Sequence, residues 1–448
     1  MVNKITLTPH QQGVFDSLWK FIEQDTAKGY LSLFTGPAGS GKSTLVIELI
    51  RKVLSDAVFN NIAVCATTNK ALRVVREMLP NVERTKITFK TVHSLLGLKH
   101  KITNNGKEVF EKDKQNPSKF GLYDVVIVDE SSMLSDDLFH EMQDQNYRGV
   151  KVIFVGDMNQ INPVNHIHAI PMLEEERVKH NICCFALTEI VRQAQDNPII
   201  KTSQEILQNT FQFSIGNKNI VDHKGVAMLN KHQPEVIHNI LKYYFCSDNF
   251  NNNTNYCKVI AWRNIIVNNF NDMIRGMKYG LNAPKLVVGE KLIVDKPIKG
   301  ETKDQILFNT NDDLVVLNIE IKSKTLYDQN FTYYDAMVEG EDETASIHVL
   351  HERSNALYNR TLKTMADDAK NEKDSYQRGQ KWLKYYGFID NFAAVKYAYA
   401  ITAHNSQGST YDNAFVVYTD IILNQNIEEQ TRIMYTATTR PKEMLYIM

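Results

Sequence analysis

Four residues near the start of the chain have the types and the spacing needed to hold phosphate. The segment FTGPAGSGKSTL, residues 34–45, fits the pattern G-x-x-x-x-G-K-[ST] with Gly36, Gly41, Lys42 and Ser43. Glycines allow consecutive backbone N–H groups to turn towards phosphate oxygens, and the N-terminus of a following helix adds its dipole. In such a loop the lysine contacts the β- and γ-phosphates and the hydroxyl binds Mg²⁺. The other expected binding residues of this loop are Ala38, Gly39, Ser40 and Thr44.

A pair of carboxylates follows a second apolar segment and completes this chemistry. In VVIVDESS, Asp129 is expected to hold Mg²⁺ and Glu130 to polarise an attacking water as general base. Gln160 follows another apolar segment, in VKVIFVGDMNQINPV, where its amide is placed to sense the γ-phosphate. Ligands of open α/β sheets bind at the carboxyl ends of the strands, so these three residues and Lys42 are expected to meet at one edge.

Short apolar runs alternate with helix-like stretches along most of the chain. Apolar strands that alternate with helices are typical of parallel sheets buried on both faces, and their division into two sets predicts two α/β domains. The predicted strands are residues 30–35, 61–67, 123–130, 150–157 and 183–189 in the first set and residues 256–262, 414–419 and 444–448 in the second.

Two segments depart from this pattern and predict insertions. Residues 97–120 contain the turn signal NNG and predict a β-hairpin. Residues 286–350 are rich in β-branched side chains and predict a small antiparallel β module, with a polar helical stretch after it. The expected domains are therefore residues 1–200 with the insert 97–120, a second domain from residues 201–285 and 392–448, and an inserted module at residues 286–391.

Composition limits the possible classes of protein. The chain has 448 residues, of which 43% are hydrophobic and 23% charged, as expected for a soluble protein of two or three domains. The net charge of −1 gives no global argument for a nucleic-acid or membrane partner, so a polyanion site must be a local patch. No apolar run approaches the length of a membrane span and the N-terminus lacks a signal core, which indicates an intracellular protein.

The five cysteines fit neither a disulfide framework nor a zinc site. Cys65, Cys183 and Cys184 lie in apolar strand-like runs and are expected to be buried free thiols. This arrangement suits a reducing compartment.

The order of the motifs resembles that of the superfamily 1 helicases, and in particular the Dda- and RecD-like branch of phages and bacteria. The resemblance extends over nearly the whole chain. The matching segments are LTPHQQGVF (7–15), GPAGSGKST (36–44), CATTNKAL (65–72), TVHSLLGL (91–98), VDESSM (128–133), GDMNQINPV (156–164), LTEIVRQ (187–193), ITAHNSQGSTYDNAFV (401–416) and YTATTRP (435–441).

The resemblance implies two RecA-like domains, a hairpin pin in the first and an SH3-like β insert in the second. It also implies an ATP-dependent DNA helicase that uses Mg²⁺, moves 5′→3′ along single-stranded DNA and unwinds forked duplexes in phage replication or recombination. A monomer in the cytoplasm of an infected cell, working beside a phage single-strand-binding protein, fits this expectation.

The same resemblance assigns roles to individual residues. Gln11 is expected to read adenine, Gly408 to lie at the nucleotide, and Arg192 and Arg440 to reach the γ-phosphate from the two domains. The expected nucleic-acid contacts are Thr68, His93, Thr402, His404 and Ser406, and Trp262 is an aromatic candidate for base stacking or for the core.

The phosphate loop by itself leaves other functions open. A small-molecule kinase needs a pocket for the phosphoryl acceptor, but no second α/β domain that carries Arg440. A nucleotide switch that binds a protein partner is a further alternative. Within the helicase interpretation, no residue distinguishes a DNA track from an RNA track, because none is identified as a 2′-OH reader.

Overall fold

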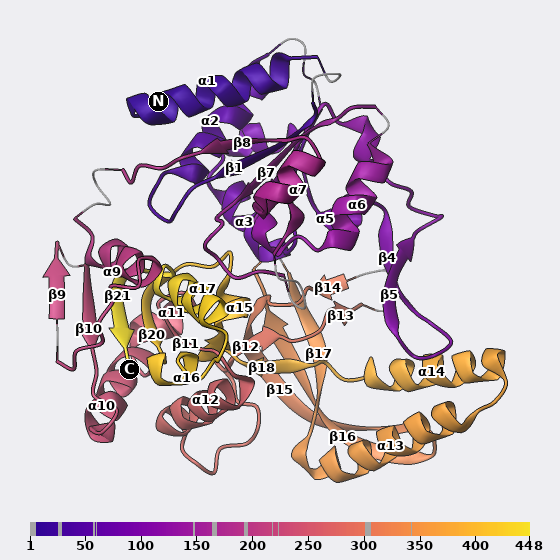
Figure 1. Cartoon of the computed structure of the whole chain (residues 1–448). Helices are drawn as coiled ribbons and strands as arrows, with labels where there is room; N and C mark the ends of the chain where they lie inside the picture. Colours follow the sequence, from indigo (N-terminus) through magenta and orange to yellow (C-terminus); the bar gives the residue numbers. More distant parts are fainter. Residues whose placement is uncertain are drawn as a thin grey trace.

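The chain forms two α/β domains and an inserted module (Figure 1). The first domain lies at the top of this view, the second at lower left and the insert at lower right. The computed structural model describes residues 6–25, 29–56, 59, 61–146, 148–163, 168–191, 196–216, 218–222, 224–300, 306–341 and 343–448.

The first domain is built on a six-stranded parallel sheet. Helices cover both faces: α1 (Pro9–Glu23), α2 (Lys42–Ser55) and α3 (Asn69–Glu77) on one, and α6 (Asp136–Gln145) on the other. All five strands predicted here are present, and a sixth, β3, is added. The strand order is β3 (Ile87–Thr91), β2 (Ile62–Ala66), β6 (Val125–Asp129), β7 (Lys151–Gly156), β1 (Leu31–Thr35) and β8 (Ile182–Ala186).

Strand β8 differs from the expectation of a strand buried on both faces. It pairs with β1 alone at one edge of the sheet, and after the buried Ile182 its side chains alternate between half-buried and exposed positions. The prediction that Cys184 is buried is therefore wrong, because its side chain is exposed, and Cys183 is only half-buried. Cys65 lies in the central strand β2 and is buried as expected.

The second domain has a six-stranded sheet whose strands are parallel except at β9. Helices α9 (Pro198–Leu207) and α17 (Ile427–Thr438) pack on one face, and α10 (Pro234–Phe245) and α12 (Asn264–Tyr279) on the other. The predicted α/β class with RecA-like parallel sheets is confirmed. The order is β19 (Ala400–Thr402), β11 (Cys257–Ala261), β20 (Tyr411–Val416), β21 (Pro441–Ile447), β10 (Lys224–Met228) and β9 (Lys218–Val221).

The inserted module is an antiparallel five-stranded sheet followed by two helices, α13 (Asn355–Asn371) and α14 (Ser375–Ile389). In Figure 1 the hairpin of β4 (Leu98–Ile102) and β5 (Glu108–Lys112) extends from the first domain towards α14. The order of the insert strands is β17 (Thr344–Leu350), β16 (Gln329–Glu339), β15 (Asp313–Leu326), β12 (Lys291–Val294) and β18 (Val395–Tyr397), beside a small pair of β13 (Ile298–Lys299) and β14 (Ile306–Phe308).

Short helices complete the described fold. None of the helices in the described residues is both long and apolar enough to cross a lipid bilayer. The short helices are α4 (Asn81–Arg84), α5 (Val92–Leu95), α7 (Glu174–Lys179), α11 (Asp248–Asn252), α15 (Ala403–Ser406) and α16 (Tyr418–Ile421).

A buried carboxylate joins the insert to the second domain. Glu290, with 0% exposure, accepts hydrogen bonds from Arg275 Nε at 2.9 Å and from the Tyr399 hydroxyl at 2.5 Å. Burial raises the pKa of Glu290, and the bonds from Tyr399 and Arg275 oppose that rise. The carboxylate thus ties helix α12 and the segment before β19 to the first strand of the insert.

We predict that Glu290→Ala destabilises the fold by about 3–5 kcal/mol, because it leaves the largely buried Arg275 guanidinium without its counter-charge. Denaturant unfolding measures this loss. Lys396→Ala is the matched control, since it removes an exposed ion pair of the insert (Lys396 Nζ to Asp295 Oδ1, 2.6 Å) and should cost less than about 1 kcal/mol. Equal losses for the two variants would contradict this role of Glu290.

Candidate functional site

The phosphate loop, residues 36–43, connects strand β1 to helix α2 and has a backbone that requires glycine. Gly39 and Gly41 have φ values of 80° and 88°, in the left-handed region. A Cβ at Gly36 would lie 2.7 Å from Ser40 Oγ and 2.9 Å from the Leu187 carbonyl oxygen, so a side chain does not fit. The loop therefore has the conformational freedom that the motif predicts.

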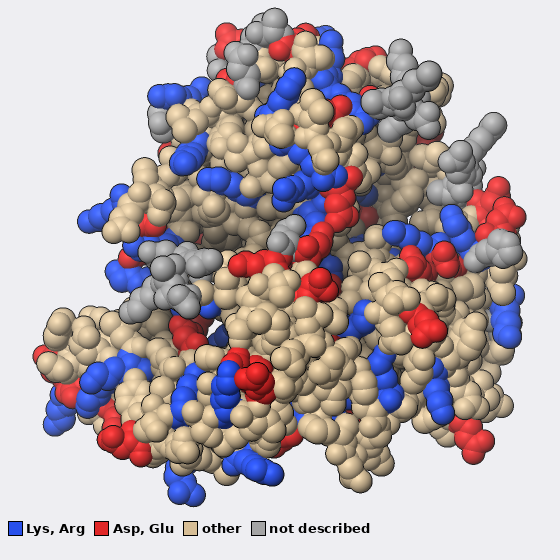
Figure 2. Space-filling view, turned by 180° about the vertical axis from the view of Figure 1, so that it is seen from behind, with Lys and Arg blue, Asp and Glu red and all other residues tan. Residues whose placement is uncertain are grey.

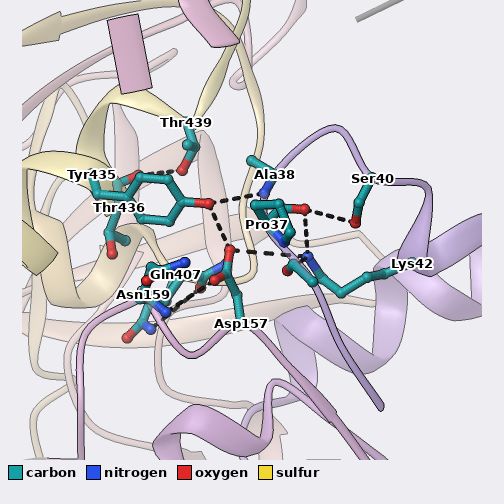
Figure 3. Close-up of polar contacts among 12 residues, drawn as sticks. Pro37, Ala38, Ser40, Lys42, Asp157, Asn159, Gln407, Tyr435, Thr436 and Thr439 are labelled. Atoms are coloured by element: carbon teal, nitrogen blue, oxygen red, sulfur yellow. Dashed lines mark hydrogen bonds and ion pairs between the residues drawn. The ribbon is translucent and has the colours of Figure 1, made fainter. Parts of the chain in front are cut away.

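Lys42 begins helix α2 and turns back over the loop (Figure 3). Its Nζ donates hydrogen bonds to the carbonyl oxygens of Gly36 and, at 3.0 Å, Pro37. The same atom lies 3.9 Å from Asp157 Oδ2. The ammonium group is thus held at the mouth of the loop, at the carboxyl ends of β1 and β7. The side chain of Ser43 is exposed and that of Thr44 half-buried in the next positions of α2.

Asp129 and Glu130 stand at the end of β6 as a pair of half-buried carboxylates. Burial raises the pKa of Asp129 to about 7, the adjacent Glu130 adds to the rise, and Lys42 opposes it. Burial also raises the pKa of Glu130, against the charges of Arg440 and Lys42. Glu130 has a φ of 48°, which turns the chain sharply after the strand. Carboxylates in such a place favour a bound cation.

The residues present fit a magnesium ion that also binds phosphate. Asp129 and Ser43 line the same cavity and supply a carboxylate and a hydroxyl oxygen. In the part of the chain that the structure describes, no cluster of three or more His, Cys, Asp or Glu residues forms a metal site of protein ligands alone. Mg²⁺ commonly takes one or two protein oxygens and completes its shell with substrate phosphates and water.

Both domains line this cavity, which has a volume of about 150 Å³. Lys42, Asp129 and Gln160 come from the first domain, and Gly408 and Arg440 from the second. Arg440 is only 6% exposed, and its Nε donates to the Thr436 carbonyl oxygen at 2.8 Å. Its guanidinium is further held by Ser409 O at 3.4 Å and Thr439 Oγ1 at 3.0 Å. The structure therefore brings Arg440 to the same cavity as Lys42.

Tyr435, on helix α17, links the second domain directly to the phosphate loop. Its hydroxyl oxygen accepts from the Ala38 N–H at 2.8 Å and donates to Asp157 Oδ2 at 2.7 Å (Figure 3). Two further bonds join the domains beside it, from Ile161 N to Thr436 Oγ1 and from Gln407 Nε2 to Ile161 O, each at 3.2 Å. The sequence analysis missed Tyr435 and Asp157, although the first opens YTATTRP and the second is the last residue of the predicted strand 150–157.

Of the predicted site residues Gln11 and Arg192, the structure describes only Gln11. Gln11 is buried: its Oε1 accepts from Thr8 N at 3.0 Å and its Nε2 donates to the Ser40 carbonyl oxygen at 3.0 Å. Its amide is thus attached to the phosphate loop. Arg192 lies outside the described residues.

The expected nucleic-acid residues lie at strand ends of both sheets. Thr68 follows β2 and accepts from Ala71 N at 3.3 Å, and Thr402 ends β19 and accepts from Asn405 N at 3.2 Å. Each hydroxyl oxygen caps a helix, and each hydroxyl proton remains available to donate.

The other residues expected to contact nucleic acid differ from one another in their surroundings. His93 packs against Phe110 of the hairpin with 4.1 Å between ring centroids and the rings tilted by 39°, and burial lowers the pKa of both His93 and His404. Ser406 is fully buried and donates to the Ala403 carbonyl oxygen at 2.7 Å, so its hydroxyl is turned into the second domain. Trp262 packs on the core of the second domain.

Two family models match the chain, one for each α/β domain. A model described as an AAA domain matches residues 19–225, and a UvrD-like helicase C-terminal domain matches residues 397–448. The ATP-dependent DNA helicase dda of Enterobacteria phage T4 is 25% identical over 466 residues, which cover 98% of this chain and 99% of the phage protein. The chain is a superfamily 1 helicase.

The helicase is also similar to proteins outside phages. An uncharacterized protein of Acanthamoeba polyphaga mimivirus is 25% identical over 506 residues, covering 98% of the helicase and 99% of that protein. A crystal structure of Bacteroides Pif1 bound to single-stranded DNA matches with a TM-score of 0.50 and 15% identity, covering 99% of the helicase and 92% of that chain. The predicted class of enzyme, an ATP-hydrolysing DNA helicase, is confirmed, and the kinase and switch alternatives are not supported.

We predict that Lys42→Ala lowers ATP hydrolysis by at least about 100-fold, because it removes the positive charge at the mouth of the phosphate loop. A steady-state ATPase assay measures the loss, and thermal unfolding should show an unchanged fold. Lys52→Ala is the matched control on the same helix, where the side chain is exposed and lies over the Trp19 ring. Substantial ATPase activity in Lys42→Ala, or an equal loss in Lys52→Ala, would contradict the assignment.

Proposed function

We propose that ATP, bound between the two RecA-like domains, drives their closure and opening and so moves the helicase 5′→3′ along single-stranded DNA. The observation that carries this proposal is that Lys42 and Arg440, from different domains, line one cavity. Hydrolysis at such a site requires both domains, so the chemistry is coupled to their relative position.

The site residues expected from the sequence have the following roles in this proposal. Lys42 and the N–H groups of Gly39, Ser40, Gly41 and Thr44 bind phosphate, and Ser43 and Asp129 hold Mg²⁺. Glu130 polarises the attacking water, and Gln160 hydrogen-bonds the γ-phosphate. Arg440 stabilises the charge that develops on the γ-phosphoryl group, an effect worth about 10³–10⁵ in rate. Gln11 reads adenine, Gly408 lies beside the nucleotide, and Arg192 is a second arginine at the γ-phosphate.

The contacts of Tyr435 support coupling between nucleotide and domain position. A ligand shifts an equilibrium between two conformations only by its different affinity for each. The γ-phosphate has such a difference if it contacts residues of both domains. Because the Tyr435 hydroxyl bonds the Ala38 N–H and Asp157, a rearrangement of the phosphate loop is transmitted directly to helix α17.

The DNA track in this proposal crosses both domains. Thr68 and His93 of the first domain and Thr402 and His404 of the second supply hydroxyl and imidazole groups for phosphates and sugars. Trp262 stacks on a base, and the buried Ser406 stabilises the segment after strand β19 from inside the second domain. The phage T4 helicase acts on DNA and the Bacteroides Pif1 structure holds single-stranded DNA, which supports the same substrate here.

The hairpin of β4 and β5 is proposed as a pin that separates the strands of a fork, braced by helix α14. The Tyr386 hydroxyl donates to the Gly106 carbonyl oxygen at 2.8 Å, and Arg378 Nε donates to the Asn104 carbonyl oxygen at 3.2 Å. A tip fixed on a helix keeps its position against the duplex. Phe110, 54% exposed, is an apolar group that the hairpin presents to a base pair.

The domain limits, biological role, location, oligomeric state and partner in this proposal follow from the resemblance to the Dda- and RecD-like helicases. The domain limits are those expected from the sequence, with residues 286–391 as an SH3-like module and helical extension. We therefore propose that the helicase works in phage replication or recombination, in the cytoplasm of the host, as a monomer and beside a single-strand-binding protein; the similarity to a phage DNA helicase supports the phage setting.

We predict that single-stranded DNA stimulates the ATPase and that the helicase displaces strands only from forks with a 5′ single-stranded tail. Fork substrates of either polarity, with a matched RNA track as a third arm, measure direction and substrate together. Arg440→Ala should lower turnover at saturating ATP about 10³-fold while ATP affinity changes little. An ATPase that does not respond to single strands, or unwinding from 3′ tails alone, would overturn the proposal.

We predict that Gly106→Val slows duplex unwinding by about tenfold or more, while ATPase activity on single-stranded DNA is kept. Gly106 has a φ of 74°, and a Cβ there would lie 2.6 Å from Trp382 Cδ2, so a side chain forces the tip away from α14. Gly387→Ala, on the same helix, meets no atom within 4 Å and is the control. If both activities of Gly106→Val fell together, the hairpin would not be a pin.

A further inference from the structure

Three parts of the molecule meet at the carboxylate of Asp313, on strand β15 of the insert. Its Oδ2 lies 3.1 Å from Lys70 Nζ of helix α3 in the first domain. Its Oδ1 lies 3.9 Å from Lys258 Nζ of strand β11 in the second domain. The side chains of Lys70 and Asp313 are only 15% and 14% exposed, so this ion pair is largely removed from water.

A second pair of charges lies beside the first. Arg73 Nη2, one turn along α3, lies 3.5 Å from Oδ1 of Asp312, the residue just before β15. Arg73 also forms an ion pair with Glu341. These residues border a polar cavity of about 310 Å³ between α3 and the insert. Figure 2 shows Lys and Arg side chains of the upper domain facing Asp and Glu side chains across the boundary below it.

The charges around Asp313 favour its ionised form. Burial raises the pKa of Asp313, but Lys70 and Lys258 outweigh burial and hold it below its ordinary value. Burial lowers the pKa of Lys70, but Tyr411 and Asp313 outweigh burial and raise it. Asp313 Oδ1 receives no hydrogen bond from the described residues, so attraction to the lysines is its main stabilising interaction.

Helix α3 is also part of the nucleotide cavity. Ala71, Val74 and Val75 line the cavity, one or two positions away from the residues that hold the insert. Ala71 Cβ is 3.2 Å from where a Cβ on Gly408 would lie, so α3 touches the second domain there as well. The position of α3 therefore depends on how the two domains close around the nucleotide.

The insert is covalently part of the second domain but meets the first domain at two places. Its base contacts α3 through Asp312 and Asp313, and its helix α14 contacts the hairpin tip. If the base of the insert were not attached to α3, motion of the second domain relative to the first would separate the hairpin tip from α14.

We propose that Asp313 is a positioning residue that attaches the insert to helix α3, so that α14 and the hairpin keep their contact while the two domains move. This inference rests on the proposed translocation and assigns to Asp313 the coupling of that motion to strand separation. Asp313 takes no part in binding or hydrolysing ATP.

The test compares Asp313→Asn, Lys70→Met and the double variant. Each should unwind forked duplexes about tenfold more slowly than the natural helicase, while ATPase activity on single-stranded DNA stays within about twofold. Because the two side chains act through each other, the double variant should be no slower than either single one. Lys396→Met, which removes an exposed ion pair within the insert, is the control and should unwind normally.

Two further measurements keep the outcomes distinct. A dye pair on α14 and the hairpin should report a longer or broader distance in Asp313→Asn, and thermal unfolding should remain cooperative. If the natural helicase lacks DNA-stimulated ATPase, the proposed function fails. If that activity is present, any one of four results for Asp313→Asn refutes the role of Asp313. These results are normal unwinding, a loss of ATPase activity as large as the loss of unwinding, an unchanged dye distance, and an effect that adds to that of Lys70→Met.

Discussion

The arrangement of the molecule depends on half-buried carboxylates that need positive charge from more than one domain. Asp129 and Glu130 are only partly exposed to water at the end of β6, where isolated negative charges are costly. Lys42 opposes that cost from the first domain and Arg440 from the second. A carboxylate pair whose counter-charges come from two bodies makes the electrostatic energy of the site a function of their separation. This is the physical basis for linking phosphate chemistry to motion.

The central strands could be predicted from the sequence, because strands buried on both faces have continuous apolar runs. Strands β1, β2, β6 and β7 are of this kind and carry the phosphate loop and the acidic pair at their ends. The sequence does not predict strand β3, because only Ile87 is buried in it, and it predicts β8 as buried on both faces although this strand lies at an edge. Whether a strand lies at the centre or at the edge of a sheet depends on its pairing with strands that are distant in the sequence. A local residue pattern does not contain this information.

The same distinction applies to the site. Lys42, Asp129 and Gln160 follow predictable strands, and the topology brings them together. Tyr435 lies nearly 400 residues from its partner Ala38 (a separation of 397), so only the packing of two domains reveals their bond. The inward direction of Ser406 and the meeting of Asp313 with two lysines are likewise tertiary facts. Sequence patterns therefore identified the chemical groups, and the structure identified the contacts by which one domain senses another.

The chain enters and leaves the insert at two neighbouring strands. Strand β12, where the chain enters the module, pairs with β18, where it leaves, and Leu292 lies opposite Tyr397. The chain therefore leaves and re-enters the second domain at neighbouring points, whatever the length of chain between these two strands. Such an arrangement allows lineages to lengthen, shorten or replace the accessory module while the motor remains intact. Diversity among these enzymes is then expected to concentrate at this junction, and the ATPase core to change slowly.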